Sequence, residues 1–440
     1  MSNSHSRTAT RRRFLKSVVV AGGALAVSQI IPASAIGRGG MAAPSERIVT
    51  GAIGVGGRGS GDVNWILGET DVQFVAVCDV VKGRRDAAKQ AIDRRYGNKD
   101  CTTYRDLREL LARKDIDAVL IATGDRWHAL ASILAMRAGK DVYCEKPACL
   151  TMAQGREVVE TARRYGRICQ TGAQRLSELN HIFAIEMARS GRLGKVHTAY
   201  ADIRWRGGFR HDWLPTQPEP PKEEMDWDTW LGPCPWRPYN SGYMGGGWYN
   251  FHDFATDVAM WGAHTVAQAL AAFDLADITS IEFEYAGPDA SMVTRLSNGV
   301  KLVLFRVPGD VWQPCEYWHG ACGERFDGPE GWTAAADGYA KPDVSSPALL
   351  NEYKNVLADY AGRTQRPANH VRDFLDCVRT RRPTVAGPEV MLRSMSICLA
   401  ADICEQLQRN MKFDLLKLEF VGDPAANRLR SRTMREPWCV

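Results

Sequence analysis

Residues 47–79 read RIVTGAIGVGGRGSGDVNWILGETDVQFVAVCD. The apolar runs 48–53 and 72–78 predict two buried strands, and the segment between them predicts a helix. Gly54, Gly56 and Gly59 follow the first strand with the spacing G-x-G-x-x-G, which allows a tight turn and a close approach to a pyrophosphate at the helix N-terminus. Asp79 follows the second strand, where an acidic residue accepts hydrogen bonds from a ribose diol. The stretch therefore predicts a dinucleotide-binding Rossmann unit.

The first 35 residues predict an export signal. The twin-arginine pattern TRRRFLK at 10–16 precedes the apolar segment 18–31 and the small residues Ala33-Ser34-Ala35. We expect cleavage after this signal, recognition by the twin-arginine export machinery and a periplasmic location; an uncleaved anchor or a chance basic tail is the alternative. Residues 1–35 carry five Lys or Arg and no Asp or Glu, so the formal net charge of +5 becomes 0 in the mature chain. Neutrality argues against nucleic acid as a partner.

The rest of the chain has the composition of a globular protein. With 45% hydrophobic and 24% charged residues, it predicts two domains. The 12 cysteines show no metal-binding spacing, and no metal site is expected. Most cysteines are expected to be reduced core residues, because they fall in apolar strand or helix patterns: Cys78, Cys144, Cys169, Cys377, Cys398 and Cys404. Cys315 and Cys322 flank a loop, where a disulfide is an alternative.

Helices and strands alternate after Asp79, as in a doubly wound parallel sheet. Strands are predicted at 118–122, 141–144 and 168–171, with helices at 83–96, 104–112, 129–138 and 152–165. The carboxyl ends of parallel strands face the ligand crevice. Thr123, Trp127 and His128, which follow the strand at 118–122, are therefore expected to border the nicotinamide half of a cofactor. We place the Rossmann domain at residues 45–175.

Several motifs together resemble the Gfo/Idh/MocA oxidoreductase family. They are GVGGRG at 54–59, Cys78-Asp79, IAT at 121–123 with Trp127-His128, and AGKDVYCEKP at 138–147. Further similarity to the exported bacterial branch lies at 228–239, 261–264, 369–377 and 423–438. The resemblance implies an N-terminal Rossmann domain and a C-terminal α+β domain over 176–440, with an open, mainly antiparallel sheet that binds the sugar and supports a homo-oligomer.

Lys146 is the first candidate catalytic residue. A cation at the end of a strand beside the nicotinamide can bind a substrate hydroxyl, stabilise the alkoxide and, with a lowered pKa, help to move its proton. A surface lysine before a turn-forming proline is the alternative. The resemblance also implies that the Lys146-Pro147 bond is cis. The expected cofactor-binding residues are Gly54, Gly56, Gly57, Arg58, Gly59, Asp79, Thr123, Trp127, His128, Glu145 and Lys146.

His264 is the second candidate catalytic residue. Residues 251–271 predict a helix, and in the family a segment like WGAH at 261–264 presents a histidine to the substrate, with an aspartate three residues later. An imidazole suits proton abstraction near neutral pH. Here Ala267 stands at the aspartate position, and Met260 precedes Trp261 where many relatives have Asp. Asp257 is a possible substitute, and His252 is the rival base; a core histidine is the structural alternative.

The second domain also contains a long irregular segment, 207–247, of the kind that usually has a function. Its aromatic residues and their neighbours suit sugar stacking or ordinary packing: Trp205, Trp213, Trp236, Trp248 and Tyr249. A helix is predicted at 176–195 and a strand at 196–204. Antiparallel strands are predicted at 281–286, 290–296 and 300–307, helices at 371–380 and 389–409, and a tail from 422 that crosses the domain.

The predicted function is an exported NAD(H)-containing oxidoreductase that acts on a sugar or cyclitol hydroxyl. Asp79 favours NAD, because a carboxylate repels a 2′-phosphate, while Arg84 and Arg85 are compatible with NADP. Two alternatives remain. One is an NAD-dependent glycosidase that oxidises C3 transiently, as some exported relatives do. The other is a sugar-binding protein that has lost catalysis, which the replacement at Ala267 suggests.

Overall fold

The computed structural model describes residues 42–203, 209–287, 290–306 and 321–439. The chain divides into residues 1–47, with the short 3-10 helix η2 (Pro44–Glu46), and residues 48–440, which are described below. The predicted signal and Cys315 lie outside the described residues, so both the signal and the disulfide stay predictions. None of the described helices is both long and apolar enough to cross a membrane.

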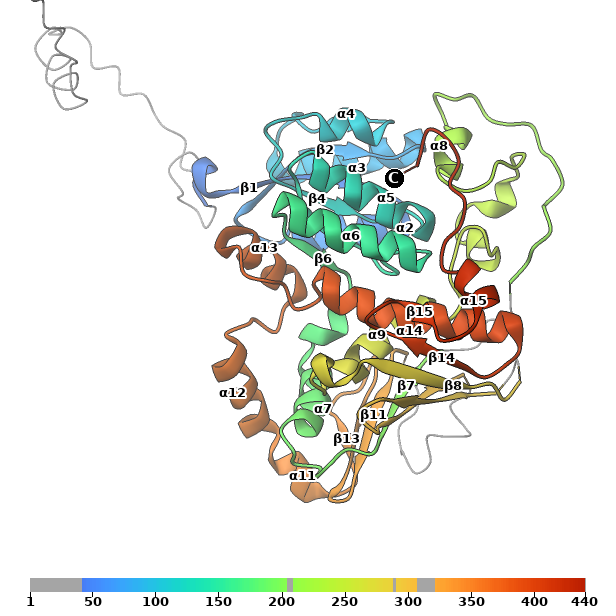
Figure 1. Cartoon of the computed structure of the whole chain (residues 1–440). Coiled ribbons are helices and arrows are strands. Elements are labelled where there is room, and N and C mark those ends of the chain that lie inside the picture. Colours follow the sequence, from blue (N-terminus) through green and yellow to red (C-terminus); the bar gives the residue numbers. More distant parts are fainter. Residues whose placement is uncertain (1–41, 204–208, 288–289, 307–320, 440) are drawn as a thin grey trace, which may run out of the picture. The chain divides into compact units, whose positions relative to one another are not determined.

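The first sheet has the predicted doubly wound topology. Its six described strands are all parallel, in the order β3-β2-β1-β4-β5-β6 (Figure 1). The strands are β1 (Ile48–Ile53), β2 (Val72–Cys78), β3 (Thr102–Tyr104), β4 (Ala118–Ile121), β5 (Asp141–Cys144) and β6 (Cys169–Thr171). The helices are α2 (Gly57–Ile66), α3 (Lys82–Tyr96), α4 (Leu107–Leu111), α5 (Asp125–Arg137) and α6 (Met152–Tyr165). The short edge strand β3 was not predicted, because three residues with two threonines give no apolar run.

Helices bury both faces of this sheet. Val119 and Ile121 of β4 pack into one core cluster with α5, whereas Ala118 and Leu120 pack into another. That second cluster includes Phe374 of helix α13 (His370–Thr380). A helix that we had assigned to the second domain therefore covers part of the first sheet, so the chain returns to the Rossmann unit after leaving it.

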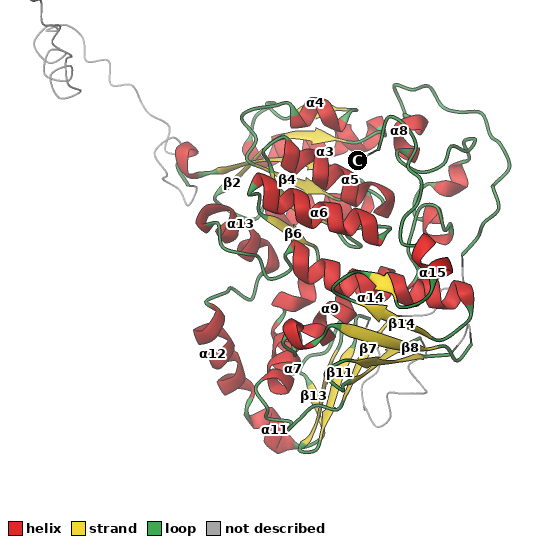
Figure 2. Ribbon diagram, viewed as in Figure 1, coloured by secondary structure: helices red, strands yellow, loops and turns green. Residues whose placement is uncertain are grey.

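The second sheet is mainly antiparallel, as predicted. Its nine described strands run in the order β13-β12-β11-β7-β10-β9-β8-β14-β15, and among them only β7 and β10 pair in parallel. The strands are β7 (Thr198–Asp202), β8 (Ser280–Glu284), β9 (Met292–Leu296), β10 (Lys301–Phe305), β11 (Glu324–Gly328), β12 (Gly331–Ala335), β13 (Asp343–Val344), β14 (Met411–Asp414) and β15 (Glu419–Phe420). The remaining helices are α7 (Leu179–Arg189), α8 (Trp227–Leu231), α9 (Val258–Ala271), α11 (Pro347–Asn351), α12 (Tyr353–Thr364), α14 (Pro388–Leu407) and α15 (Pro424–Arg428) (Figure 2).

Several predicted helices have different bounds. The helix predicted at 104–112 is the shorter α4, and the helix predicted at 129–138 is α5, which begins at Asp125 and so includes Trp127 and His128. Helix α9 begins at Val258, not at 251, because the Asp402 carboxylate on α14 accepts a hydrogen bond from the Val258 amide at 2.9 Å and satisfies the new N-terminus. The helix predicted at 176–195 is a 3-10 turn, η3 (Gln174–Ser177), followed by the shorter α7.

Residues 209–257, which we call the aromatic loop, form a core of their own. Trp227, Trp230, Tyr243 and Phe254 are all buried there. The loop is bound to the segment that follows β2, because the Lys82 amide donates to the Glu224 carbonyl at 2.8 Å. Aromatic packing therefore contributes to the order of this long segment, in addition to the backbone hydrogen bonds of α8 and of the turns.

The C-terminal tail, residues 422–439, extends further than predicted. Arg435 pairs with Asp228 at 2.6 Å and donates to the Gly232 carbonyl, so the tail is attached to the aromatic loop. The Trp438 ring then packs 4.8 Å from the Trp127 ring on α5. The tail thus connects the second domain, the aromatic loop and the Rossmann unit.

Candidate functional site

The glycine turn has the close packing that its motif predicts. Gly54 has φ +79°, and a Cβ there would lie 2.6 Å from the Thr123 backbone nitrogen. A Cβ on Gly59 would lie only 2.1 Å from the Gly54 carbonyl oxygen, so helix α2 packs directly on the turn. Gly57, by contrast, has no atom within 4 Å of such a Cβ. The third glycine of the motif therefore serves packing, and the backbone at Gly57 is open to a ligand.

A cavity of about 260 Å³ lies beside this turn. Seven predicted cofactor-binding residues line it: Gly54, Gly56, Gly57, Arg58, Asp79, Thr123 and Trp127. The Asp79 carboxylate lies in its wall, where it accepts hydrogen bonds at 2.9 Å from the amides of Val55 and Val81. Burial raises the pKa of Asp79, although these amides and Arg84 oppose the shift. The open glycine backbone and the fixed carboxylate fit the pyrophosphate and the ribose of a dinucleotide.

Three predicted cofactor-binding residues lie behind this wall. Gly59 packs on the turn, as described above. His128 is buried, with Nδ1 2.7 Å from the Pro147 carbonyl and Nε2 3.1 Å from the Thr123 carbonyl. Glu145 is also buried; its Oε1 accepts a hydrogen bond from Gln174 at 2.6 Å and lies 3.3 Å from Arg58. His128 and Glu145 therefore support the turns around the cavity and do not line it.

Sequence reasoning missed part of the lining. Arg84 was noted only for its bearing on NADP, while Arg105, Arg126, Thr229, Trp230 and Gly245-Gly246 were not selected. Trp248 and Tyr249, which we expected to stack against a sugar, also line the dinucleotide cavity, with ring centroids 3.7 Å apart. Trp213 and Trp236 are 53% and 57% exposed, and Trp205 lies outside the described residues. No local pattern links the aromatic loop to the cofactor, because the contact is made across more than 100 residues of sequence.

Lys146 is positioned by the second domain. Its Nζ donates to the Met260 carbonyl at 2.8 Å and lies 5.4 Å from the centroid of the Trp261 ring. The Lys146-Pro147 bond is cis, as expected. Burial lowers the pKa of Lys146, an effect that Glu145 opposes. This lysine is therefore not the surface residue of the alternative interpretation.

His264 lies one helical turn after Met260, on the same helix α9. In an α-helix the carbonyl of residue i faces the amide of residue i+4. Lys146 therefore binds at the turn that carries His264. The imidazole is 3% exposed, and its Nδ1 has no hydrogen-bond partner in the described part of the chain. Burial, and next the charge of Lys146, hold the pKa of His264 well below its ordinary value. The imidazole is accordingly neutral at physiological pH and able to accept a proton.

The packing of α9 explains the motif WGAH. A Cβ on Gly262 would lie 2.8 Å from the Cys398 sulfur of α14, so glycine permits the close contact of these helices. Ala267 is fully buried at the position of the expected aspartate.

Asp257, the possible substitute for the missing aspartate, and His252, the rival base, each contact an arginine. Asp257 Oδ2 lies 3.5 Å from Arg306 Nη1. His252 accepts a hydrogen bond at 2.9 Å from Arg432 of the tail, and burial lowers its pKa to about 4. The Arg306 contact occupies one carboxylate oxygen of Asp257 and the Arg432 contact occupies Nε2 of His252, and the roles of both residues stay predictions.

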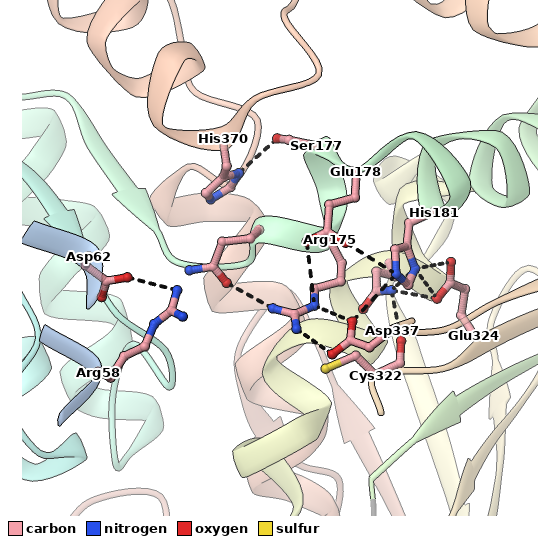
Figure 3. Close-up of polar contacts among 12 residues, drawn as sticks. Arg58, Asp62, Arg175, Ser177, Glu178, His181, Cys322, Glu324, Asp337 and His370 are labelled. Atoms are coloured by element: carbon pink, nitrogen blue, oxygen red, sulfur yellow. Dashed lines mark hydrogen bonds and ion pairs between the residues drawn. The ribbon is translucent and has the colours of Figure 1, made fainter. Parts of the chain in front are cut away.

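Arg175 is a further cation near these two residues. It forms a two-point contact with Asp337, at 2.8 and 2.5 Å, and its charge lowers the pKa of both Lys146 and His264. Figure 3 shows the polar contacts that link Arg175 with Asp337, His181 and Glu324, and the separate ion pair of Arg58 with Asp62. The partly exposed Asp337 thus holds the cation in place near the candidate catalytic pair.

Family models confirm what the fold suggests. The model described as "Oxidoreductase family, NAD-binding Rossmann fold" matches residues 48–173, and that described as "Oxidoreductase family, C-terminal alpha/beta domain" matches residues 346–440. Together they account for about half of the chain. The chain belongs to the Gfo/Idh/MocA oxidoreductase family. Its first sheet is the family's NAD-binding Rossmann fold, and the boundary at 175 stays a prediction.

Individual relatives are similar over only part of the chain. Inositol 2-dehydrogenase of Salmonella paratyphi B is 34% identical over 127 residues, which are 28% of this chain and 36% of that protein. D-glucoside 3-dehydrogenase of Escherichia coli is 31% identical over 144 residues, 31% and 38% of the two chains. A glycosyl hydrolase family 109 protein of Shewanella baltica is 32% identical over 156 residues, 34% of each. The matches thus span little more than a third of these relatives.

A solved structure shows the likeness of the whole fold. The WlbA dehydrogenase of Chromobacterium violaceum, in complex with NADH and UDP-GlcNAcA, superposes with a TM-score of 0.57 at 16% identity. The superposition covers 84% of this chain and 97% of that one. The two-domain architecture is therefore shared beyond the region of sequence similarity.

Proposed function

We propose that this protein is an NAD-dependent oxidoreductase that acts on a CH–OH group of a sugar or cyclitol. The observation that carries the proposal is the contact between Lys146 and the Met260 carbonyl. It brings a lysine from the Rossmann unit to the helical turn that carries a neutral, buried His264. The names of the relatives, which include inositol and glucoside dehydrogenases, support the substrate class.

The side chains divide the chemistry between them. His264 accepts the hydroxyl proton of the substrate, because its imidazole is neutral and its Nδ1 has no partner among the described residues. Lys146 and Arg175 stabilise the negative charge that develops on the oxygen. A bound NAD supplies the acceptor for the hydride. Asp79, Thr123 and the glycine turn would hold it, and the Asp79 carboxylate favours NAD over NADP.

Export is a further part of the proposal. We infer that the twin-arginine pattern at 10–16 directs the folded protein to the periplasm, where the cofactor has to remain bound and be regenerated. The aromatic loop and the tail support retention, since residues of the loop line the dinucleotide cavity. We also propose a homo-oligomer through the second sheet, as the family resemblance implies.

The test is spectroscopic. The purified mature protein is mixed with a panel of free sugars, cyclitols and glycosides while the near-ultraviolet absorbance of reduced nicotinamide is followed. One compound should change the redox state of the copurified nucleotide, and Lys146→Met should abolish that change while the nucleotide stays bound. Lys99→Met, which alters an exposed lysine, is the matched control. Equal reduction by wild type and Lys146→Met would refute the assignment.

A second candidate function is glycoside cleavage through transient oxidation at C3. The similarity to a glycosyl hydrolase family 109 protein favours it. Release of nitrophenol from a nitrophenyl glycoside, without net reduction of the cofactor, would distinguish it from dehydrogenation. Turnover that depends on Lys146 in either assay would exclude the catalytically inactive binding protein.

A further inference from the structure

Arg126 is a buried cation with an incomplete set of hydrogen bonds. It lies in the first turn of α5, and its side chain is 4% exposed. Nε donates to the Trp230 carbonyl at 2.7 Å, and the guanidinium stacks on the Trp230 ring, 3.6 Å from the centroid. Nη1 has no hydrogen-bond partner among the described residues. Burial lowers the pKa of Arg126 to about 10, so it stays charged at neutral pH. A buried charge of this kind is costly unless an anion binds it.

The cavity that Arg126 lines is rich in cations. Arg58, Arg84 and Arg105 line it as well, and Asp79 is the one carboxylate among its described lining residues. Arg84 lies at the glycine turn, where its Nη1 is 3.0 Å from the position of a Cβ on Gly56. Arg126 lies at the turn after β4, where its Nη1 is 2.3 Å from the position of a Cβ on Gly124. Two guanidinium groups therefore lie at the two turns that face this cavity.

The cavity lining places Arg126 on the dinucleotide side of the site. Arg84 is the neighbouring cation that lowers the pKa of Arg126. Arg175 is the cation that acts on both Lys146 and His264. Arg126 is one of the described residues that line the dinucleotide cavity, and Lys146 and His264 are not among them.

We propose that Arg126, together with Arg84, binds the pyrophosphate of the dinucleotide from the α5 side of the cavity. The proposal rests on the proposed function, which requires bound NAD. A guanidinium can form two parallel hydrogen bonds to a phosphate, a geometry that a helix N-terminus alone does not provide. Since Trp230 holds Arg126, the aromatic loop becomes part of the phosphate-binding site.

The test compares ligands with and without phosphate. Binding of ADP-ribose, adenosine and 2′-AMP to the full mature chain, freed of copurified nucleotide, is measured by calorimetry for wild type, Arg126→Gln and Arg126→Lys. We expect Arg126→Gln to weaken the binding of ADP-ribose roughly 10- to 100-fold and to keep the affinity for adenosine within about twofold of the wild-type value. Arg126→Lys should recover part of the loss, because it restores the charge but not the paired donors. Arg137→Gln, on the same helix but paired with Glu157, is the matched control and should bind like wild type.

Three results would overturn the inference. An equal loss of affinity for adenosine and for ADP-ribose would show that Arg126 only supports the fold of the cavity. A greater loss of affinity for 2′-AMP than for ADP-ribose would show that Arg126 binds a 2′-phosphate and not the pyrophosphate. Unchanged ADP-ribose affinity in Arg126→Gln would refute phosphate binding and leave the proposed oxidoreductase intact. If wild type binds none of the three ligands, the proposed function fails as well.

Discussion

Replacement of Gly59 by alanine tests the link between packing at the glycine turn and cofactor binding. The added Cβ would lie 2.1 Å from the Gly54 carbonyl oxygen and 3.0 Å from the Gly54 carbonyl carbon. Both atoms are backbone, so no side chain can rotate away, and helix α2 has to move from the turn. Overpacking of this kind destabilises a protein by about 1–3 kcal/mol. The better helix propensity of alanine offsets less than about 1 kcal/mol of this loss. We expect a net loss of about 1–2 kcal/mol in the free energy of unfolding.

The same shift should weaken NAD binding, because it displaces the helix N-terminus from the cavity. Gly61→Ala is the matched control. It lies two residues further along α2, and its Cβ would have no atom within 4 Å. We expect this control to gain about 0.5–1 kcal/mol and to keep its NAD affinity. Urea unfolding and calorimetric titration with NAD measure both effects. The reasoning is refuted if Gly59→Ala matches Gly61→Ala in both measurements.

Three further predictions concern charge and attachment. Burial raises the pKa of Asp62 to about 8, and the charge of Glu145 adds to the shift. Asp62 therefore keeps a proton in the folded protein that it loses above about pH 4 in the unfolded chain. The free energy of unfolding should therefore fall by up to about 1.4 kcal/mol per pH unit as the pH rises from 5 to 7. In urea unfolding, Asp62→Asn should remove this pH dependence. The same pH dependence in wild type and Asp62→Asn would contradict the prediction. Arg435→Ala removes the ion pair with Asp228 and should speed NAD dissociation roughly three- to tenfold in a displacement assay. Arg295→Ala, which breaks an ion pair with Glu284 away from the tail, should not. The pKa of His264 is held well below its ordinary value of 6.5, so kcat/KM should not fall near pH 6.5. His264→Asn should lose turnover while it still binds NAD. A fall in kcat/KM centred near pH 6.5 would argue against His264 as the base.

Local sequence was sufficient for the glycine turn of the Rossmann unit and for the two strands beside it. A strand, a glycine turn, a helix and an acid at the end of the next strand are all encoded within residues 47–79, because each depends on backbone conformation and on apolar periodicity. The same holds for Lys146 and His264, which lie in short motifs. The bounds of α9 were less predictable, since its N-terminus is set by Asp402, far along the chain.

Only the tertiary structure shows how the Rossmann unit and the rest of the chain each contribute residues to the site. The sequence determined the fold class, the cofactor-binding turn and the two candidate catalytic residues. It did not show that Met260 binds Lys146, that Arg126 has only Trp230 as a hydrogen-bond partner among the described residues, or that Trp248 lines the dinucleotide cavity. These contacts join residues more than 100 positions apart through side chains and carbonyls that have no periodic signal. Only the packing of the aromatic loop and of α9 against the Rossmann unit brings them together.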